Sequence, residues 1–249
     1  MKLADQTIVV TGAAQGLGAA IARHLAGQGA RLVLMDYNAE GLAQTQTLSP
    51  GALAITVDLS DESDTARAIA KIPGPVHTLI HNAAILRVEP VDVVSLATFQ
   101  ATLNVGIQAA FQLTQAVWPA MKAGGGALVF VSSRSGVEGF VDETAYCAAK
   151  HALEGFSKCL AMEGAAQGIA SYTITPGHLM HTPMSETTYG PEQRAKWIDP
   201  IRLAPAFAML ARDRPMALSG QRLDAWQLSQ QETEHDNAGH LRLDRRQRR

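Results

Sequence analysis

Short runs of β-branched and apolar residues alternate with longer helical patterns along most of this 249-residue chain. Glycine, proline or polar residues bound each run, which is typical of buried strands. Six strands are expected on this pattern, and a seventh segment is a further candidate. They are Thr7–Thr11, Arg31–Met35, Ala54–Val57, Thr78–His81, Ala127–Val131 and Ala170–Thr175, with Gln221–Trp226 as the candidate.

Helical periodicity fills the intervals between these strands. After the first strand, apolar residues recur at the spacing of an amphipathic helix, and Gly27 and Gly29 end the pattern. Further helices are expected near Asp61–Lys71, Leu96–Lys122, Tyr146–Gln167 and Leu203–Arg212. Because alternating strands and helices require crossover connections, we predict an α/β fold, a single doubly wound parallel sheet with helices on both faces.

The turn after the first strand is rich in glycine and reads Thr-Gly-Ala-Ala-Gln-Gly-Leu-Gly over residues 11–18. Glycines at such a turn let the backbone approach a pyrophosphate, and the helix N-terminus that follows attracts the anion. A strand before the turn and a helix after it make the motif much more specific than glycines alone. We therefore predict a Rossmann-type dinucleotide site whose first contacts are Gly12, Gln15, Gly16, Leu17 and Gly18.

The second strand ends at Asp36, about 20 residues beyond this loop, where an acidic residue is expected to bind the adenosine ribose. A carboxylate there repels the additional phosphate of NADP, and neither Tyr37 nor Gln15 supplies a compensating positive charge. The expected cofactor is NAD, with Asp36 and Tyr37 among its contacts. A solvated acid opening the next loop is the alternative explanation of Asp36.

Tyr146 and Lys150 stand four residues apart, on one face of a predicted helix. A free tyrosine has a pKa near 10, too high for a base at neutral pH. An ammonium ~4 Å away contributes roughly 4 kcal/mol at an effective dielectric of ~20, which would bring the phenol pKa close to 7. The pair is then suited to exchange a proton with an alcohol or carbonyl oxygen. Taken alone, the same spacing often marks a surface contact.

Ser132 and Ser133 follow the fifth strand, and Ser133 lies thirteen positions before Tyr146. With the glycine loop, this arrangement resembles the short-chain dehydrogenase/reductase family over roughly residues 5–226. The resemblance implies four catalytic residues, Asn104, Ser133, Tyr146 and Lys150, the last two also contacting the coenzyme. It also implies further coenzyme contacts at Asp58, Leu59, Asn82, Ala83, Ala84, Pro176, Gly177, Leu179 and Thr182.

The resemblance also implies a role for each catalytic residue. Tyr146 would be the general acid/base and Ser133 would hold the substrate oxygen. Lys150 would bind the nicotinamide ribose and lower the tyrosine pKa, and Asn104 would maintain a helix irregularity that anchors a proton-relay water. The expected activity is NAD-dependent interconversion of a secondary alcohol and a ketone, with the redox chemistry supplied by the cofactor.

The chain departs from the family pattern in four places. His81 stands where the family usually has Asn, and Ala84 where it usually has Gly. The sixth strand lacks the usual Arg and Asn, and the usual Asp-Gly-Gly ending is replaced by residues 223–226 and a tail. The last two departures bear on subunit packing rather than on chemistry. A homo-oligomer, tetramer or dimer, is expected from the resemblance, with small alanines on the helix near Tyr146–Gln167 as modest support.

The expected domain covers residues 1–229 and includes a substrate lid at about 178–200, and a polar, flexible tail is expected over 230–249. The net charge of −2 provides no basic surface for nucleic acid or an anionic membrane. No signal peptide or membrane-spanning run is recognised. Cys147 and Cys159 lie about 18 Å apart along one predicted helix, too far for a disulfide. We therefore expect a cytoplasmic protein.

The substrate cannot be identified from the sequence, and a sugar, a polyol or a hydroxy acid are the open choices. Arg87 and Arg134 follow the fourth and fifth strands, so both are expected at the rim of the substrate site, where they would favour an anionic or strongly polar group. Pairing with Glu89 and Glu138 is the alternative. No metal site is expected. Two other functions remain open: a retired dehydrogenase that senses dinucleotides, and a nucleotide-sugar epimerase.

Overall fold

Seven parallel strands form one sheet in the computed structural model, which describes residues 2–234. Their order is β3-β2-β1-β4-β5-β6-β7, so the prediction of a doubly wound parallel sheet is confirmed. The strands are β1 Thr7–Thr11, β2 Arg31–Asp36, β3 Leu53–Thr56, β4 Thr78–His81, β5 Gly126–Val131, β6 Ile169–Thr175 and β7 Arg222–Asp224. The four central strands are buried along their whole length, which explains their continuous apolar character.

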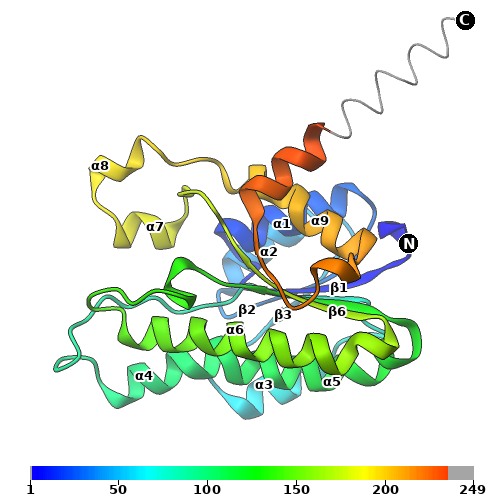
Figure 1. Ribbon diagram of the computed structural model, residues 1–249, viewed down its shortest axis with the longest axis horizontal. Helices are drawn as coiled ribbons and strands as arrows, with labels where there is room; N and C mark the ends of the chain where they lie inside the picture. Colours follow the sequence, from blue (N-terminus) through cyan, green and yellow to red (C-terminus); the bar gives the residue numbers. More distant parts are fainter. Residues whose placement is uncertain (1, 235–249) are drawn as a thin grey trace, which may run out of the picture.

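Helices cover both faces of the sheet (Figure 1). Alternate residues of β1 point to opposite faces: Ile8 and Val10 pack into one hydrophobic core and Val9 into the other. On the first face lie α1 Gly16–Gly27, α2 Ala39–Thr47 and α9 Ala204–Asp213. On the second lie α3 Glu62–Ile69, α4 Leu96–Leu103, α5 Ala109–Gly124 and α6 Thr144–Gly164.

The strand order reverses between β1 and β4, which pair in parallel register. In an open parallel sheet, ligands bind beyond the carboxyl ends of the strands at such a reversal. The connections that follow β1, β4, β5 and β6 all emerge at this edge. These four connections carry most of the predicted site residues.

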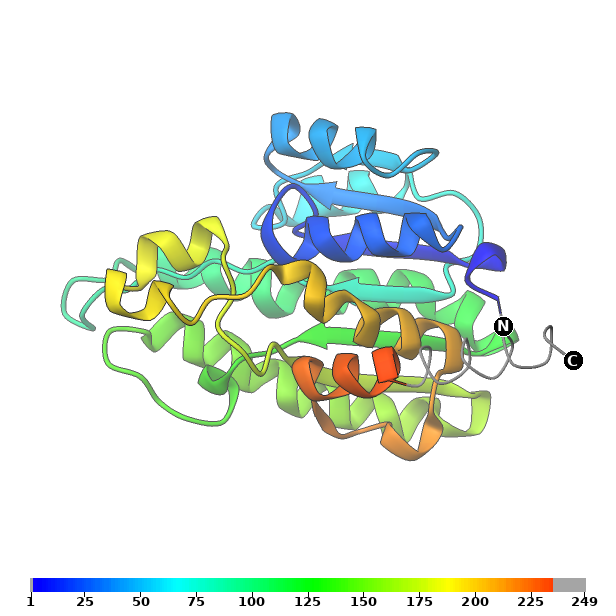
Figure 2. The same ribbon diagram turned by 90° about the horizontal axis from the view of Figure 1, so that it is seen from above.

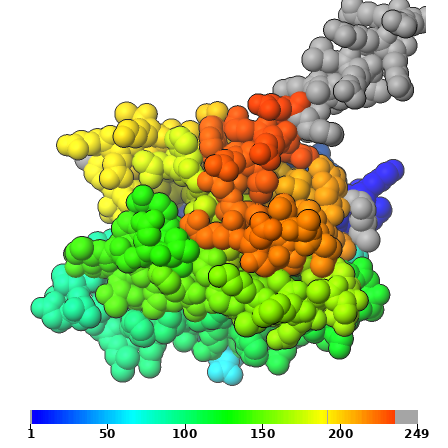
Figure 3. Space-filling model, viewed as in Figure 1, coloured from blue at the N-terminus to red at the C-terminus, as the bar shows by residue number. Residues whose placement is uncertain are grey.

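A lid follows β6. It contains two short helices, α7 Pro183–Thr188 and α8 Pro191–Arg194, and a bridge between Met180 and Ile198 closes it into a loop. The lid projects from the body of the molecule at the carboxyl edge of the sheet (Figure 2). It overhangs the segment around residues 134–143, coloured green in the space-filling view (Figure 3).

The helices of the structure depart from the sequence prediction in two places. The helix predicted near Leu96–Lys122 is interrupted by a π-helical segment, η2 Asn104–Gln108, between α4 and α5. The helix α2 was not expected, because its sequence is polar and lacks a clear apolar stripe. Asn38 begins α2 by accepting a hydrogen bond from the backbone N–H of Gly41, a capping signal that the apolar pattern does not contain.

The prediction of a flexible tail over 230–249 was wrong for residues 230–234. Residues 225–234 are helical, and they are docked on the 3₁₀ helix η5 Pro200–Leu203 and on α9. The buried hydroxyl of Ser229 donates to the carbonyl of Leu203 and accepts from the N–H of Ala206. The rest of the predicted tail, residues 235–249, lies outside the described residues. None of the helices formed by residues 2–234 has the length and apolar character needed to cross a bilayer.

Candidate active site

The turn between β1 and α1 depends on three glycines. Gly12 and Gly16 have φ values of +64° and +56°, a backbone region that residues with a side chain rarely adopt. Gly18 lies so close to the preceding turn that a Cβ would come within 2.0 Å of the Gly12 carbonyl oxygen. Gln15 precedes α1 without capping it through its side chain, so the first N–H groups of the helix remain available to an anion. The loop has the backbone geometry of a phosphate cradle.

Asp36 is buried at the end of β2, with 8 % of its surface exposed. One carboxylate oxygen accepts the backbone N–H of Ala14, and the other accepts that of Asn38, both at 3.0 Å. Each oxygen keeps a free lone pair for a ribose hydroxyl. The carboxylate therefore also holds the glycine loop against β2, a function that the sequence did not indicate. Tyr37 beside it is 76 % exposed.

Thr11, Asn82 and Ala83 connect the glycine loop to the end of β4. The Thr11 hydroxyl accepts the backbone N–H groups of Asn82 and Ala83, both at 3.1 Å. The Asn82 amide donates to the carbonyls of Thr11 and Gly12 at 3.2 and 3.0 Å. Asn82 thus shapes the loop through its side chain, and any coenzyme bound there would meet a rigid backbone.

His81 extends this network to the π-helical segment. Its Nδ1 lies 3.1 Å from the Thr11 hydroxyl, and its Nε2 lies 3.0 and 3.1 Å from the carbonyls of Val105 and Gly106. Complete burial lowers the pKa of His81 to about 4, so the imidazole is neutral at physiological pH. The sequence indicated His81 only as a departure from the family pattern, and its linking role was missed.

Asn104 is the first residue of the π-helical segment, so the helix irregularity that the resemblance implied is present. Its side-chain amide donates to the carbonyl of Ser60 at 2.9 Å. This bond ties the segment to the connection after β3, which carries the exposed Asp58 and the buried Leu59. The other predicted coenzyme residues lie on the connections after β4 and β6, at Ala84, Pro176, Gly177, Leu179 and Thr182.

Ser133, Tyr146 and Lys150 lie together at the carboxyl end of β5. The Ser133 hydroxyl acts on the Tyr146 phenol and opposes the rise of its pKa, and it accepts the backbone N–H of Ser135 at 3.2 Å. The Lys150 ammonium donates to the Val131 carbonyl at 2.6 Å and lies 5.4 Å from the centre of the Tyr146 ring. Tyr146 is 9 % exposed and Lys150 only 2 %. The three groups are placed for proton exchange with an oxygen at the sheet edge.

The expectation that Lys150 brings the Tyr146 pKa close to 7 is wrong for this structure. Burial raises the pKa of Tyr146 above its ordinary value of 10.0, and the hydrogen bond with Ser133 only partly opposes this effect. Burial also lowers the pKa of Lys150 to about 8. The simple Coulomb argument omitted the cost of desolvating both groups, which is the larger effect here.

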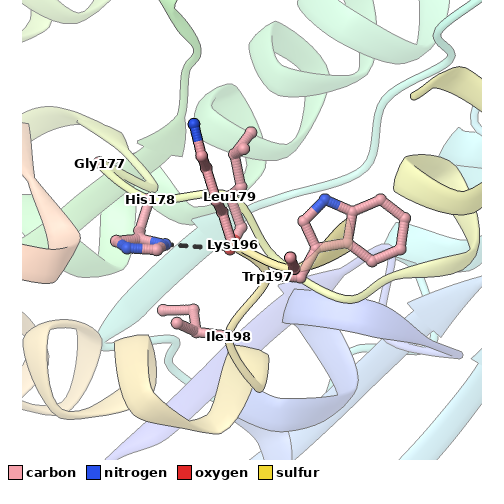
Figure 4. A pocket seen from close by; sticks show the side chains of 7 residues that line it. Gly177, His178, Leu179, Lys196, Trp197 and Ile198 are labelled. Atoms are coloured by element: carbon pink, nitrogen blue, oxygen red, sulfur yellow. Dashed lines mark hydrogen bonds between the residues drawn. The ribbon is translucent and has the colours of Figure 1, made fainter. Parts of the chain in front are cut away.

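Gly177 and Thr182 place the start of the lid against the coenzyme loop. A Cβ on Gly177 would overlap the carboxylate of Asp224, and one on Gly16 would come within 3.2 Å of the Thr182 side chain. Thr182 itself caps α7 by accepting the N–H of Ser185. An open pocket lies within the lid itself. Figure 4 shows that its lining comes from two lid segments, residues 177–179 and 195–198.

Charged and phenolic side chains on the segment after β5 and on the lid act on one another near Tyr146. Glu143 accepts a hydrogen bond from the Ser135 hydroxyl at 2.9 Å, and its charge acts on both Tyr146 and Tyr189. Arg134 also acts on Tyr189 and lies over the ring of Phe140, 5.1 Å from its centre. Sequence reasoning assigned no role to Glu143, although its position three residues before Tyr146 was a usable signal.

The expected alternative pairings of the two rim arginines are not found. Among the described residues, neither Arg87 with Glu89 nor Arg134 with Glu138 forms an ion pair. Arg87 is exposed, and the backbone N–H of Glu89 donates to the carbonyl of Asp142. Both arginines remain available at the rim. No cluster of three or more metal-ligating side chains occurs within residues 2–234.

The family model described as short chain dehydrogenase matches residues 6–193. The chain belongs to the short-chain dehydrogenase family. D-threitol dehydrogenase of Mycolicibacterium smegmatis is 31% identical over 235 residues, covering 88% of this chain and 90% of its own length. L-xylulose reductase of Mus musculus is 33% identical and covers 79% and 80%.

Solved structures agree with this membership. A putative NAD(P)-dependent gluconate 5-dehydrogenase from Beutenbergia cavernae, with bound NADP at low occupancy, superposes on this short-chain dehydrogenase with a TM-score of 0.82. The two are 29% identical, and the match covers 90% of this chain and 98% of the other. The family uses a nicotinamide dinucleotide, and its members include dehydrogenases and reductases of polyols and sugars.

Proposed function

We propose that this short-chain dehydrogenase interconverts a secondary alcohol and a ketone with NAD(H), using Tyr146 as general acid/base. The observation that carries the proposal is the meeting of Ser133, Tyr146 and Lys150 at the carboxyl end of β5. This strand pairs with β4, which pairs with β1, the strand that the glycine loop follows. A protein that only senses dinucleotides would have no need of a serine and a buried tyrosine hydroxyl placed together with a buried lysine.

The roles follow from the positions of the side chains. Ser133 and Tyr146 hold the substrate oxygen between their hydroxyls, and the Tyr146 proton moves to or from that oxygen. Lys150 holds a positive charge next to the phenol and reaches the ribose side of the site. Asn104 keeps the π-helical segment in place through Ser60. The bound nicotinamide supplies the redox chemistry.

The coenzyme preference rests on Asp36. Its carboxylate is fixed by two backbone N–H groups and has free lone pairs toward the ribose side of the loop. An additional phosphate there would face a fixed negative charge, and residues 13–15 and 37–38 contain no lysine or arginine to offset it. These features support NAD over NADP.

For the substrate we propose a neutral polyol or the corresponding ketose. Glu143, Tyr189 and Arg134 present hydrogen-bonding groups at the mouth, which suits a chain of hydroxyls. The Glu143 carboxylate would repel an anionic hydroxy acid. The polyol dehydrogenase and ketose reductase among the relatives point to the same class.

The proposal is tested by following NAD reduction and NADH oxidation over a panel of substrates. The panel contains tetritols, pentitols, hexitols, their ketoses, 2-hydroxy acids and simple secondary alcohols. We expect turnover of at least one polyol–ketose pair and at least tenfold lower kcat/KM for the hydroxy acids. NAD binding without turnover of any alcohol or ketone would overturn the proposal and favour a dinucleotide sensor.

We also propose a homo-oligomer built on α5 and α6. Phe111 of α5 is 51 % exposed and Met162 of α6 is 73 % exposed, both large for a solvated helix face. Of the alanines expected to support close helix contact, Ala149 and Ala161 are instead buried within the chain. Light scattering at micromolar concentration is expected to show a dimer or tetramer, and a monomer would contradict this.

The cellular location is proposed from the thiols. Cys147 and Cys159 are both free and lie on the same helix, α6. Unpaired thiols fit a reducing compartment, which supports a cytoplasmic enzyme. Cell fractionation with an antibody would place it, and recovery in a secreted fraction would contradict the proposal.

A further inference from the structure

A carboxylate is buried directly behind the catalytic serine. Glu154 lies on α6 one helical turn beyond Lys150 and is 7 % exposed. One of its oxygens accepts the Ser132 hydroxyl at 2.5 Å, and the other accepts the Thr173 hydroxyl at 2.6 Å. Ser132 and Thr173 are themselves only 2 % exposed. Two short bonds from two strand ends therefore hold this carboxylate in one orientation.

Arg222 joins this carboxylate to the backbone of Ser133. Its Nε lies 3.3 Å from Glu154 Oε1, and its Nη2 donates to the Ser133 carbonyl at 3.1 Å. Arg222 is the first residue of β7 and the register partner of Thr173 on β6. The sheet thus places the guanidinium on the same side as the Thr173 hydroxyl, where its planar fork can bind two partners at once.

The loop that carries Ser133 packs closely against Glu154 and the backbone of Lys150 at Gly136. A Cβ on Gly136 would come within 2.6 Å of the Ser132 hydroxyl and 3.2 Å of both Glu154 Oε1 and the Lys150 carbonyl. The Gly136 N–H donates to the Ser133 carbonyl at 2.9 Å. The carbonyl of Ser133 is therefore fixed by two donors, one from its own 3₁₀ turn, η3 Arg134–Gly136, and one from Arg222.

We propose that Glu154 and Arg222 act as a positioning pair, which holds the Ser133 loop in place and sets a negative charge beside Lys150. Neither residue is assigned a contact with the reacting atoms. Arg222 acts through the Ser133 carbonyl, and Glu154 acts through Arg222, Ser132 and Lys150. The catalytic part of this inference rests on the proposed function, because it assumes that Ser133 and Lys150 take part in turnover.

The charges around Lys150 support the second half of the proposal. Tyr146 and Glu154 face it from α6, His81 from β4, and Arg222 lies beyond Glu154 on β7. Burial lowers the pKa of Lys150, and the Glu154 carboxylate raises it. Removing that carboxylate therefore makes the ammonium lose its proton at lower pH.

The first test uses variants of Arg222, which is 29% exposed at its side chain and can be changed without opening the core. In Arg222→Met we expect kcat to fall about tenfold while NAD affinity stays within about twofold, because a small displacement of Ser133 affects only the chemical step. Arg222→Lys retains the charge without the planar fork, so we expect partial recovery. Arg31→Met is the matched control, since the exposed Arg31 donates to the Asp5 carbonyl at 3.1 Å at the amino edge of the sheet, opposite the site.

The second measurement needs neither coenzyme nor turnover. Amide hydrogen exchange over residues 131–137 is expected to accelerate about tenfold in Arg222→Met and to stay unchanged in Arg31→Met. Ser132→Ala removes only one hydroxyl donor, and a smaller acceleration is expected. If Arg222→Met fails to fold, Ser132→Ala and Arg222→Lys still decide the proposal.

The third measurement concerns charge. In Glu154→Gln the alkaline limb of ketone reduction is expected to move down by about one pH unit, because Lys150 loses its stabilising carboxylate. A merely structural role would lower the melting temperature without moving this limb.

The outcomes separate the two proposals. Unchanged exchange over residues 131–137 together with unchanged kcat would overturn the positioning pair, even in an active enzyme. If the unmodified enzyme turns over no substrate, the proposed function fails, while the exchange data still show whether Arg222 holds the Ser133 loop.

Discussion

The hydroxyl of Thr11 donates a hydrogen bond to Nδ1 of His81 across 3.1 Å. The direction follows from the partners of the hydroxyl, because its two lone pairs are taken by the N–H groups of Asn82 and Ala83. With Nδ1 accepting, the neutral imidazole carries its proton on Nε2 and donates it to the carbonyls of Val105 and Gly106. One neutral ring thus connects the coenzyme loop to the π-helical segment of Asn104.

This assignment predicts an acid-sensitive fold. The pKa of His81 falls from an ordinary 6.5 to about 4 in the folded chain, so the unfolded chain binds a proton first as pH decreases. Stability from this residue is complete above pH 6.5 and is lost as pH falls toward 4, by about 3 kcal/mol in total. Urea unfolding between pH 7 and 4.5 measures the loss.

His81→Asn is the control for that measurement, because Asn does not titrate and the family usually has it there. The variant is expected to lose less stability over the same pH interval. Parallel pH dependence of the two proteins would show that His81 does not contribute.

In the proposed mechanism, proton transfer depends on the Tyr146 hydroxyl. Tyr146→Phe is expected to lower kcat at least 100-fold and to leave NAD affinity largely intact, because only the proton donor is removed. Lys150→Ala is expected to damage both, because it also removes the ribose contact. Steady-state rates and NAD titration on both variants check this. Near-normal kcat in Tyr146→Phe would refute the mechanism.

In the proposed function, coenzyme choice depends on the charge of Asp36. We expect kcat/KM for NAD to exceed that for NADP at least tenfold, equivalent to ~1.4 kcal/mol. Asp36→Asn preserves the size and one acceptor for the backbone bonds of Ala14 and Asn38, and it should narrow the ratio by removing the repulsion. Steady-state kcat/KM values with NAD and with NADP, for both proteins, measure this ratio. Equal use of the two by the unmodified enzyme would contradict this role.

The glycine loop has no room for a side chain at Gly18. In Gly18→Ala the new Cβ would meet the Gly12 carbonyl at 2.0 Å, so the loop must shift and NAD binding should fall below detection in a titration. Gly27→Ala is the matched control in the same helix, where no atom lies within 4 Å of the added Cβ. It should bind NAD normally and gain about 0.5–1 kcal/mol of stability. Normal NAD binding by Gly18→Ala would contradict the cradle geometry.

Arg134 is expected to contribute to substrate affinity rather than to catalysis. Its guanidinium lies over Phe140 at the mouth of the site, so Arg134→Ala should raise KM for the active polyol up to about tenfold and leave kcat nearly unchanged. Steady-state kinetics on that polyol, with Arg31→Ala as control, measures this. An unchanged KM would show that this arginine does not recognise the substrate.

The sequence by itself determined the sheet and the location of the site. Continuous apolar runs, the glycine positions and the four-residue spacing of Tyr146 and Lys150 are local signals, and each depends on residues within a few turns of one another. They were sufficient to predict the parallel strands, the glycine loop after β1 and the placement of Tyr146 and Lys150 on one helix face, whereas Asn104 and Ser133 were assigned from the family resemblance. The polar helix α2 was not predicted, because its start is marked by the N-cap residue Asn38 and not by an apolar stripe.

Only the tertiary structure decided which distant groups touch and how strongly water is excluded from them. His81 meets Thr11 across 70 positions, and Arg222 reaches Ser133 across 89. The direction of the Tyr146 pKa shift depends on the same assembly, because burial raises the pKa and outweighs the effect of Ser133. Hydrogen-bond partners and desolvation arise when remote segments pack together, and no short stretch of sequence contains that information.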